Sequence, residues 1–263
     1  NDYSHKQYKA RGDNATDRHL LQLSSEEEEM IKLVGKNFDK VVLVLNTSNP
    51  LELGFVEDPD YGIDSVVYMG YPGTRGTVGV ANLLAGKSDF MGRLSDTYAY
   101  DLSTNPSFAI SGREGDGHYV DHGRMYADYS EDIYVGYKWY ETAYADGFWD
   151  SEYAKQRWGI ENGYDDVVQY PFGYGMSLSK FDWQIKEVRV NGQKGTIDGV
   201  NEIKNKTDVI EVDVQVTNKG KIKSRDVIQL YYSAPYTVGG IEKSAVNLGA
   251  FVKTYSENAD DPA

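Results

Sequence analysis

The chain has 263 residues, 40% of them hydrophobic, and a formal net charge of −14. This length can bury one sizeable core or two smaller ones, and we expect two units. The negative charge argues against nucleic acid binding, which relies on clustered Lys and Arg, and the lack of cysteine excludes disulfides and thiolate zinc sites. No run approaches the roughly 18 apolar residues of a membrane helix, so no membrane span is expected.

The first predicted element is a helix that begins near Ser25. Ser25 and Glu28 fit a capping box, and four consecutive glutamates stand where the positive end of the helix dipole is expected. Apolar residues then recur at helical spacing up to Phe38. The glutamate run is therefore interpreted as a solvated first turn and not as a metal site.

Two short apolar runs, VVLVLN at 41–46 and SVVYMG at 65–70, predict strands of a parallel sheet. A glycine-rich turn at 71–79 follows the second run, and the apolar segment 78–87 predicts a buried helix. The glycines lack the spacing of a phosphate-binding or dinucleotide-binding loop, so they are attributed to close packing. Strand, turn and helix in succession indicate an α/β layer fold.

The segment 105–129 has no periodicity and predicts a long loop. It contains the densest local group of chemically active side chains: Glu114, Asp116, His118, Asp121 and His122. The two histidines are four residues apart, which would suit a metal on a helix, but nearby glycines argue against that helix. We therefore favour a solvated loop, expect Glu114 not to be catalytic, and assign no catalytic, cofactor-binding or metal residue.

Beyond Phe181 the period changes to two, and apolar residues alternate with polar ones from 210 to 216. The sequence TNKGK then turns the chain, and DVIQLYYSAP at 226–235 predicts another strand. This pattern is typical of an antiparallel β-sandwich, but it provides fewer than the about seven strands of a full one. We expect the remaining strands to lie outside this chain.

Two aromatic stretches, at 132–142 and 169–181, place several rings between glycines. The chain has 22 tyrosines, whose flat faces and hydroxyls suit both sugar binding and packing. We favour packing for the two stretches. The segment between them, 143–169, is predicted to be irregular, so Trp149 and Trp158 are expected to be freer to reach a ligand.

In spacing and order, these stretches resemble the late motifs of glycoside hydrolase family 3, the β-glucosidase and β-xylosidase type. VLNTSNPLEL at 44–53, FMGRLSDTY at 90–98 and the strand region 216–235 also resemble that family, although Thr74 and Arg75 depart from its usual turn. The resemblance implies an α/β fold: a three-layer α/β sandwich with a mostly parallel sheet at 1–182, followed by an antiparallel fibronectin type III-like β-sandwich at 183–263. Both are expected to be truncated.

The resemblance also implies a function, that of the non-barrel portion of a retaining exo-acting β-glycosidase. Its expected partners are a catalytic (β/α)8 barrel domain, which carries the aspartate nucleophile, and a β-linked oligosaccharide or glycoside. The acid/base glutamate is expected upstream of Asn1, because residues 1–23 contain no glutamate. The chain alone is therefore predicted to be inactive and to need no cofactor.

The competing interpretation is a non-catalytic carbohydrate-binding or adhesion module on the same scaffold, and a nucleotide-binding α/β domain is the least favoured. Homo-oligomerisation, sugar specificity and the order of barrel and present segment are left open. A secreted or bacterial envelope setting is slightly favoured for an acidic, cysteine-free sugar hydrolase.

Overall fold

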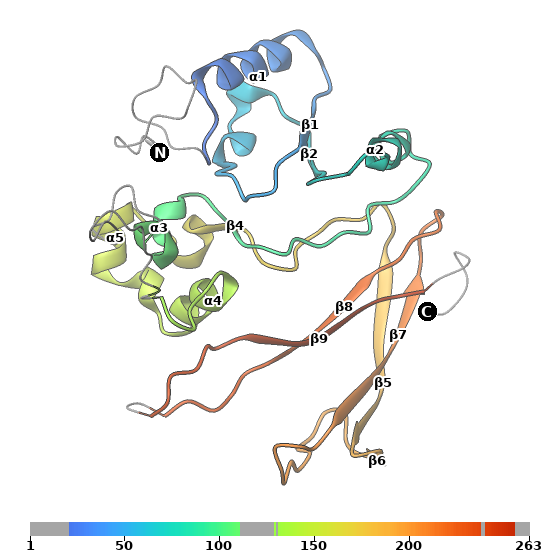
Figure 1. Cartoon of the computed structure of the whole chain (residues 1–263). Helices are drawn as coiled ribbons and strands as arrows, with labels where there is room; N and C mark the ends of the chain where they lie inside the picture. Colours follow the sequence, from blue (N-terminus) through green and yellow to red (C-terminus); the bar gives the residue numbers. More distant parts are fainter. Residues whose placement is uncertain (1–20, 111–128, 130, 238–239, 256–263) are drawn as a thin grey trace. The chain divides into compact units, whose positions relative to one another are not determined.

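The computed structural model describes residues 21–110, 129, 131–237 and 240–255 (Figure 1). It shows a mixed α/β chain whose contacts separate into two compact units. Unit 1 comprises Asn1–Thr74, Leu94–Tyr174 and Tyr231–Gly249, and unit 2 comprises Arg75–Arg93, Gly175–Leu230 and Ala250–Ala263. No helix within the described ranges is long and apolar enough to cross a membrane.

Unit 1 begins with helix α1, Ser25–Asn37. The predicted helix is confirmed, but its capping box is formed one residue earlier than predicted, by Ser24 and Glu27. The Ser24 hydroxyl accepts from the Glu27 amide at 3.2 Å, and the Glu27 carboxylate accepts from the Ser24 amide at 2.9 Å. Ser24 can act as the cap because its backbone is still extended, whereas Ser25 is already helical.

The parallel strand pair predicted from the two apolar runs is confirmed. Strand β1, Val42–Leu45, pairs in parallel with β2, Ser65–Tyr68, in a register that ends with Leu45 opposite Tyr68. The 3-10 helices η1, Gly54–Glu57, and η2, Pro59–Tyr61, lie between these strands in sequence. A Cβ at Gly35 of α1 would lie 2.1 Å from the Tyr61 carbonyl oxygen, so only glycine permits this close approach.

The rest of unit 1 is built from short elements. Strand β3, Tyr98–Ala99, pairs antiparallel with β4, Val168–Tyr170. The helices of this region are η3 (Leu102–Thr104), α3 (Pro106–Ile110), α4 (Tyr137–Ala145), η4 (Phe148–Asp150), α5 (Glu152–Trp158) and η5 (Gly163–Asp166). The prediction that 143–169 is irregular was wrong, because three of these helices lie in it.

Unit 2 contains helix α2, Gly76–Leu84. The predicted helix is present, but the expectation that it is buried was wrong, since none of its residues is buried and Val78 and Leu84 are exposed. The apolar composition of a helix indicates which residues could be buried. Burial itself requires a neighbouring element that covers those residues.

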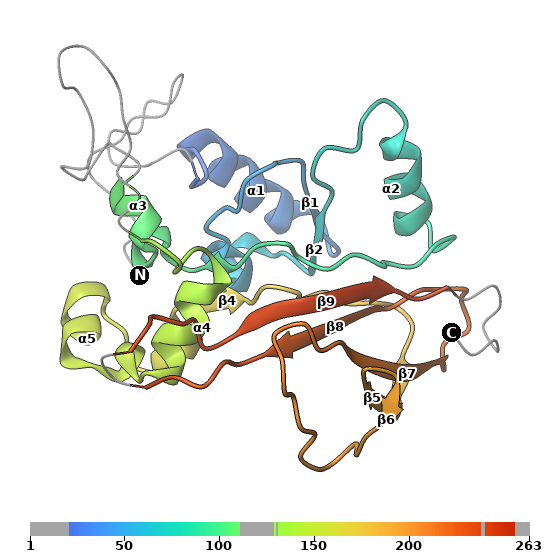
Figure 2. The ribbon, with the colours of Figure 1, turned by 60° about the horizontal axis from the view of Figure 1, so that its bottom comes forward.

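The strands predicted at 210–216 and 226–235 are confirmed as β7, Ile210–Asn218, and β8, Val227–Tyr232, whereas no strand was predicted at 181–190. Strand β5, Phe181–Val190, pairs antiparallel with β7, Ile210–Asn218, and at its far end with the short β6, Gln193–Lys194. Strands β8, Val227–Tyr232, and β9, Asn247–Lys253, lie side by side as a two-stranded sheet (Figure 2). The predicted domain boundary at 182/183 falls within β5 and stays a prediction.

Candidate functional site

The carboxyl ends of β1 and β2 form the best candidate site in unit 1. Because the two strands are parallel and Leu45 pairs with Tyr68, the loops 46–50 and 69–74 leave the sheet at the same edge. In open α/β sheets, ligands bind outside the carboxyl ends of the strands. We call these two segments the carboxyl-end loops.

Local geometry shapes both loops. In the first, the Thr47 hydroxyl accepts from the Asn49 amide at 3.2 Å and closes a tight turn. In the second, Gly70 has φ +61°, a left-handed conformation that favours glycine, and the following Tyr71 side chain is 79% exposed. The second loop therefore presents a tyrosine ring to solvent next to a sharp backbone turn.

Three tyrosines form a series of edge contacts that begins at the end of β2. Tyr68, at the end of β2, makes an edge contact with Tyr98, with ring centroids 6.4 Å apart, and Tyr98 makes a second edge contact with Tyr170. Burial, together with the nearby Tyr68 and Asp96, raises the pKa of Tyr98 to about 12. Tyr98 is therefore neutral at physiological pH and acts as a packing ring, whereas Tyr68 and Tyr71 keep exposed surface.

Two glutamates of unit 1 are engaged in structural hydrogen bonds. Glu52 is buried, and its carboxylate accepts from the Leu102 amide at 2.8 Å and from the Gln22 side chain at 2.6 Å. The Glu57 carboxylate accepts from the Tyr100 hydroxyl and from the side-chain NH2 group of Gln169, each at 2.9 Å. These carboxylates join distant parts of unit 1, so we assign them to stability and not to chemistry.

The acidic and histidine-rich loop singled out in the sequence lies outside the described residues. This applies to Glu114, Asp116, His118, Asp121 and His122, whose assignment to a solvated loop stays a prediction. Within the part of the chain that the structure describes, no group of three or more His, Asp or Glu side chains could hold a metal ion.

Rings from the two aromatic stretches pack together within unit 1, which agrees with the packing role favoured for them. The Tyr137 ring of α4 stacks on Phe172, with centroids 4.4 Å apart and planes 23° apart, and it meets Tyr231 edge-on. The Tyr137 hydroxyl accepts from the Leu248 amide at 3.0 Å. These rings are used to join segments, so the packing interpretation is confirmed for them.

The expectation that Trp149 and Trp158 can reach a ligand was wrong. Trp149 is fully buried, and its indole N–H donates to the Tyr140 carbonyl at 3.2 Å. Trp158 packs against the same core and donates to the Ser103 hydroxyl at 3.1 Å. The missed signal is Ser151, whose hydroxyl caps α5 and thereby starts the helix that helps to enclose Trp149.

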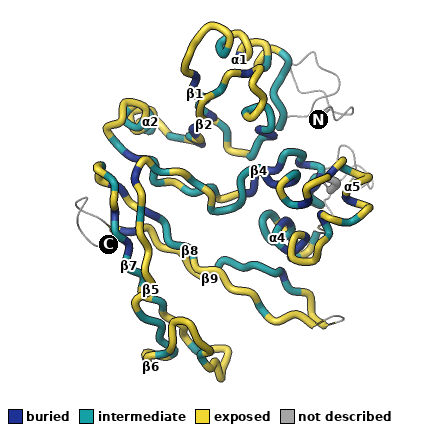
Figure 3. The backbone as a smooth tube through the Cα atoms, turned by 180° about the vertical axis from the view of Figure 1, so that it is seen from behind, coloured by how far each residue is buried: buried dark blue, intermediate teal, exposed yellow. Residues whose placement is uncertain are grey.

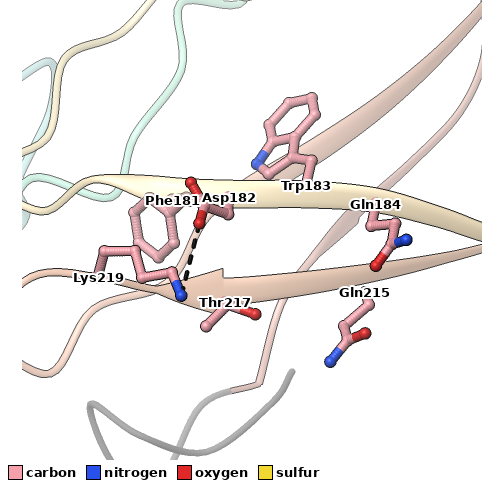
Figure 4. A pocket seen from close by; sticks show the side chains of 7 residues that line it. All are labelled: Phe181, Asp182, Trp183, Gln184, Gln215, Thr217 and Lys219. Atoms are coloured by element: carbon pink, nitrogen blue, oxygen red, sulfur yellow. Dashed lines mark ion pairs between the residues drawn. The ribbon is translucent and has the colours of Figure 1, made fainter.

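Unit 2 has an open hollow of about 820 Å³ over β5 and β7 (Figure 4). Its lining is mostly polar and comprises Phe181, Asp182, Trp183, Gln184, Gln215, Thr217 and Lys219. An exposed ion pair, 3.5 Å between Lys219 Nζ and Asp182 Oδ2, lies within it. Nothing in the sequence singled out this surface, and its polar side chains are ordinary for the solvated face of an antiparallel sheet.

Comparison with known proteins identifies the class of this fold. Residues 4–137, just over half of the chain, match the profile of the glycosyl hydrolase family 3 C-terminal domain. The chain therefore belongs to that family, which confirms the resemblance predicted from its motifs.

Individual relatives are β-glucosidases. β-Glucosidase A of Butyrivibrio fibrisolvens is 33% identical over 92% of this chain, and a β-glucosidase of Ruminococcus albus is 31% identical over 92%. The crystal structure of a β-glucosidase from Paenibacillus barengoltzii matches 99% of this chain with a TM-score of 0.71 and 30% identity. The chain covers only 26%, 20% and 23% of these three proteins, respectively.

Proposed function

We propose that this chain is the non-barrel portion of a retaining, exo-acting β-glucosidase-like enzyme that hydrolyses terminal β-linked sugars. The observation that carries the proposal is its family membership, together with β-glucosidase relatives aligned over more than nine-tenths of the chain. In this proposal residues 1–182 are a three-layer α/β sandwich domain, and 183–263 are an incomplete fibronectin type III-like domain.

The proposed role is to shape the sugar pocket and to dock the catalytic barrel. A retaining glycosidase needs two carboxyl groups roughly 5 to 5.5 Å apart, one as nucleophile and one as acid/base. The buried carboxylate of Glu52 already binds the Leu102 amide and the Gln22 side chain, which suits a structural role. We therefore assign the reacting pair to sequence other than the described residues, and we predict that the chain alone is inactive.

The carboxyl-end loops are the proposed sugar-facing surface. Tyr71 offers an exposed aromatic face on which the apolar side of a pyranose ring can stack, and Asn46, directly after β1, can hydrogen-bond sugar hydroxyls through its amide. These groups would orient the substrate, and they leave bond cleavage to the carboxyl pair. Such a role affects substrate binding more than turnover.

Co-expression with a complementary fragment of a family 3 β-glucosidase, one that carries both the (β/α)8 barrel and the acid/base glutamate, tests the proposal. We expect the two parts to co-purify and to hydrolyse an aryl β-glucoside, and we expect neither to do so alone. Turnover by the isolated chain would contradict the proposal. Co-purification and sugar binding without turnover would instead favour a non-catalytic carbohydrate-binding module.

Two variants test the assignment of Tyr71 to the sugar-facing surface. Tyr71→Ala is expected to raise KM several-fold with little change in kcat, because it removes only an exposed stacking surface. Tyr153→Ala is the matched control, since Tyr153 is 62% exposed on α5, and it should leave both constants unchanged. Equal effects of the two changes would refute a specific role for Tyr71.

A further inference from the structure

Asp89, in the segment that follows α2, is hydrogen-bonded by the residues that immediately precede β5. The Asp89 side chain is only 1% exposed. Its carboxylate accepts from the Ser177 hydroxyl at 2.7 Å and from the amides of Leu178 and Ser179 at 2.7 and 3.1 Å. Three donors from consecutive residues therefore hold one buried carboxylate, and they tie the segment 85–93 to the first residues of the β5 region.

Asp226 makes a second buried connection at the other end of the same segment. It is 3% exposed and forms an ion pair with Arg93 and a hydrogen bond of 2.8 Å from the Trp183 indole N–H. Its backbone also exchanges two hydrogen bonds with Thr254, just after β9. One carboxylate group thus connects the segment 85–93 with β5 and with the start of β8.

The backbone makes a third close contact between these parts. A Cβ added at Gly175 would lie 2.5 Å from the Gly92 carbonyl oxygen and 3.0 Å from the Arg93 side chain. Real Cβ contacts are not this short, so the chain can approach here only because residue 175 is glycine. All three contacts are made within unit 2.

Apolar burial provides little additional support in this unit. Among the described residues of unit 2, Val216 is the only hydrophobic side chain that is buried. Removing one partner of a buried ion pair leaves an uncompensated charge and is strongly destabilising. The polar contacts of Asp89 and Asp226 are therefore well placed to decide whether the segment 85–93 stays attached to the strands.

We infer that Asp89, Asp226 and their partners clamp residues 76–93 and strands β5 and β8 into one cooperative unit. The groups that make this clamp all belong to unit 2. The inference is independent of the proposed function.

Hydrogen exchange followed by mass spectrometry on the whole chain tests the clamp. Asp89→Asn should speed amide exchange in 76–93 and in 177–190 together, by at least about tenfold, because the charge is removed and one of the two accepting oxygens becomes an NH2 group, which cannot accept. Asp182→Asn is the matched control, since it removes an exposed ion pair from β5 and should change neither segment.

A milder variant keeps the test decisive if Asp89→Asn does not fold. Trp183→Phe removes the indole N–H that donates to Asp226 and keeps a smaller aromatic ring at this 55% exposed position, and it should again speed exchange in both segments. Faster exchange in 177–190 with no change in 76–93 would overturn the inference. So would an equal effect of Asp182→Asn.

The clamp and the proposed function can fail separately. Exchange is measured without barrel or sugar, so absence of glucosidase activity in the co-expressed complex would leave the clamp intact. An active wild-type complex whose Asp89→Asn variant shows unchanged exchange in 76–93 would refute the clamp alone.

Discussion

The two units of this chain are stabilised by different kinds of buried group. Unit 1 buries aromatic and aliphatic side chains around Trp149 and around the Leu45 cluster. In unit 2, no residue of β5 or β6 is buried, and Figure 3 shows their backbone as exposed or intermediate. Its buried polar residues within the described ranges are Asp89, Ser179, Asn218, Ser224, Asp226 and Thr254.

This difference has a physical consequence. Apolar packing is non-directional, so its stability follows the volume and area that are buried. A buried polar network is directional, and it stabilises one geometry only while every member keeps its partner. We therefore expect unit 1 to lose stability in proportion to deleted volume, and unit 2 to respond to charge and pH.

The largest effect is expected at the centre of the unit 1 core. Trp149→Ala removes a fully buried indole in contact with several other rings and should lower the free energy of unfolding by about 4 kcal/mol. Urea denaturation followed by circular dichroism measures this change. Tyr153→Ala, at an exposed position nearby in sequence, should cost far less, and similar losses for both variants would show that unit 1 has no specific aromatic core.

The corresponding change in unit 2 deletes charge instead of volume. Asp226→Ala leaves the poorly exposed Arg93 guanidinium without its partner and should lower the free energy of unfolding by about 3 kcal/mol. The double variant Asp226→Ala with Arg93→Met should recover part of that loss, because no unpaired charge remains. A double variant no more stable than Asp226→Ala would contradict a charge-based origin.

A pH effect is expected from Asp89. Burial alone would raise the pKa of Asp89, but hydrogen bonds led by Ser177 lower it to about 2, below the ordinary 3.8. Because the folded-state pKa is depressed, the stabilisation is fully present above about pH 4 and is lost as the pH falls toward 2. After allowance for solvent screening, the loss should be on the order of 1–2 kcal/mol.

Acid titration of stability measures this loss. The wild-type chain should be destabilised between pH 4 and pH 2, and Asp89→Asn should lack that component of the slope. Parallel pH profiles for the two proteins would assign the acid sensitivity to other carboxyl groups.

The smallest effect is expected at the start of α1. Ser24→Ala removes the capping hydroxyl from the Glu27 amide and should lower the free energy of unfolding by about 1 kcal/mol. Ser25→Ala is the control that separates the observed capping box from the one first predicted. A larger loss of stability for Ser25→Ala than for Ser24→Ala would instead support the predicted capping box of Ser25 and Glu28.

Local patterns predicted much of the fold. The helix 25–37, the parallel strands β1 and β2, and the strands β7 and β8 were each expected from local sequence patterns, because hydrophobic spacing acts over a few residues. The aromatic stretches at 132–142 and 169–181 also indicated the family from sequence alone, and family membership is confirmed. The stacking of Tyr137 on Phe172 agrees with the packing role that was favoured for these stretches.

Tertiary structure alone decided which polar residues are buried. In sequence, Asp89 and Asp226 stand in the charged segments KSDF and SRDV and look like solvated residues. Their partners lie far along the chain: Ser177 is 88 residues from Asp89, and Arg93 is 133 residues from Asp226. Likewise, Trp149 was expected to be accessible to a ligand, because the residues that bury it are brought together only by folding. Sequence periodicity records which face of an element is apolar, whereas burial depends on what the rest of the chain places against it.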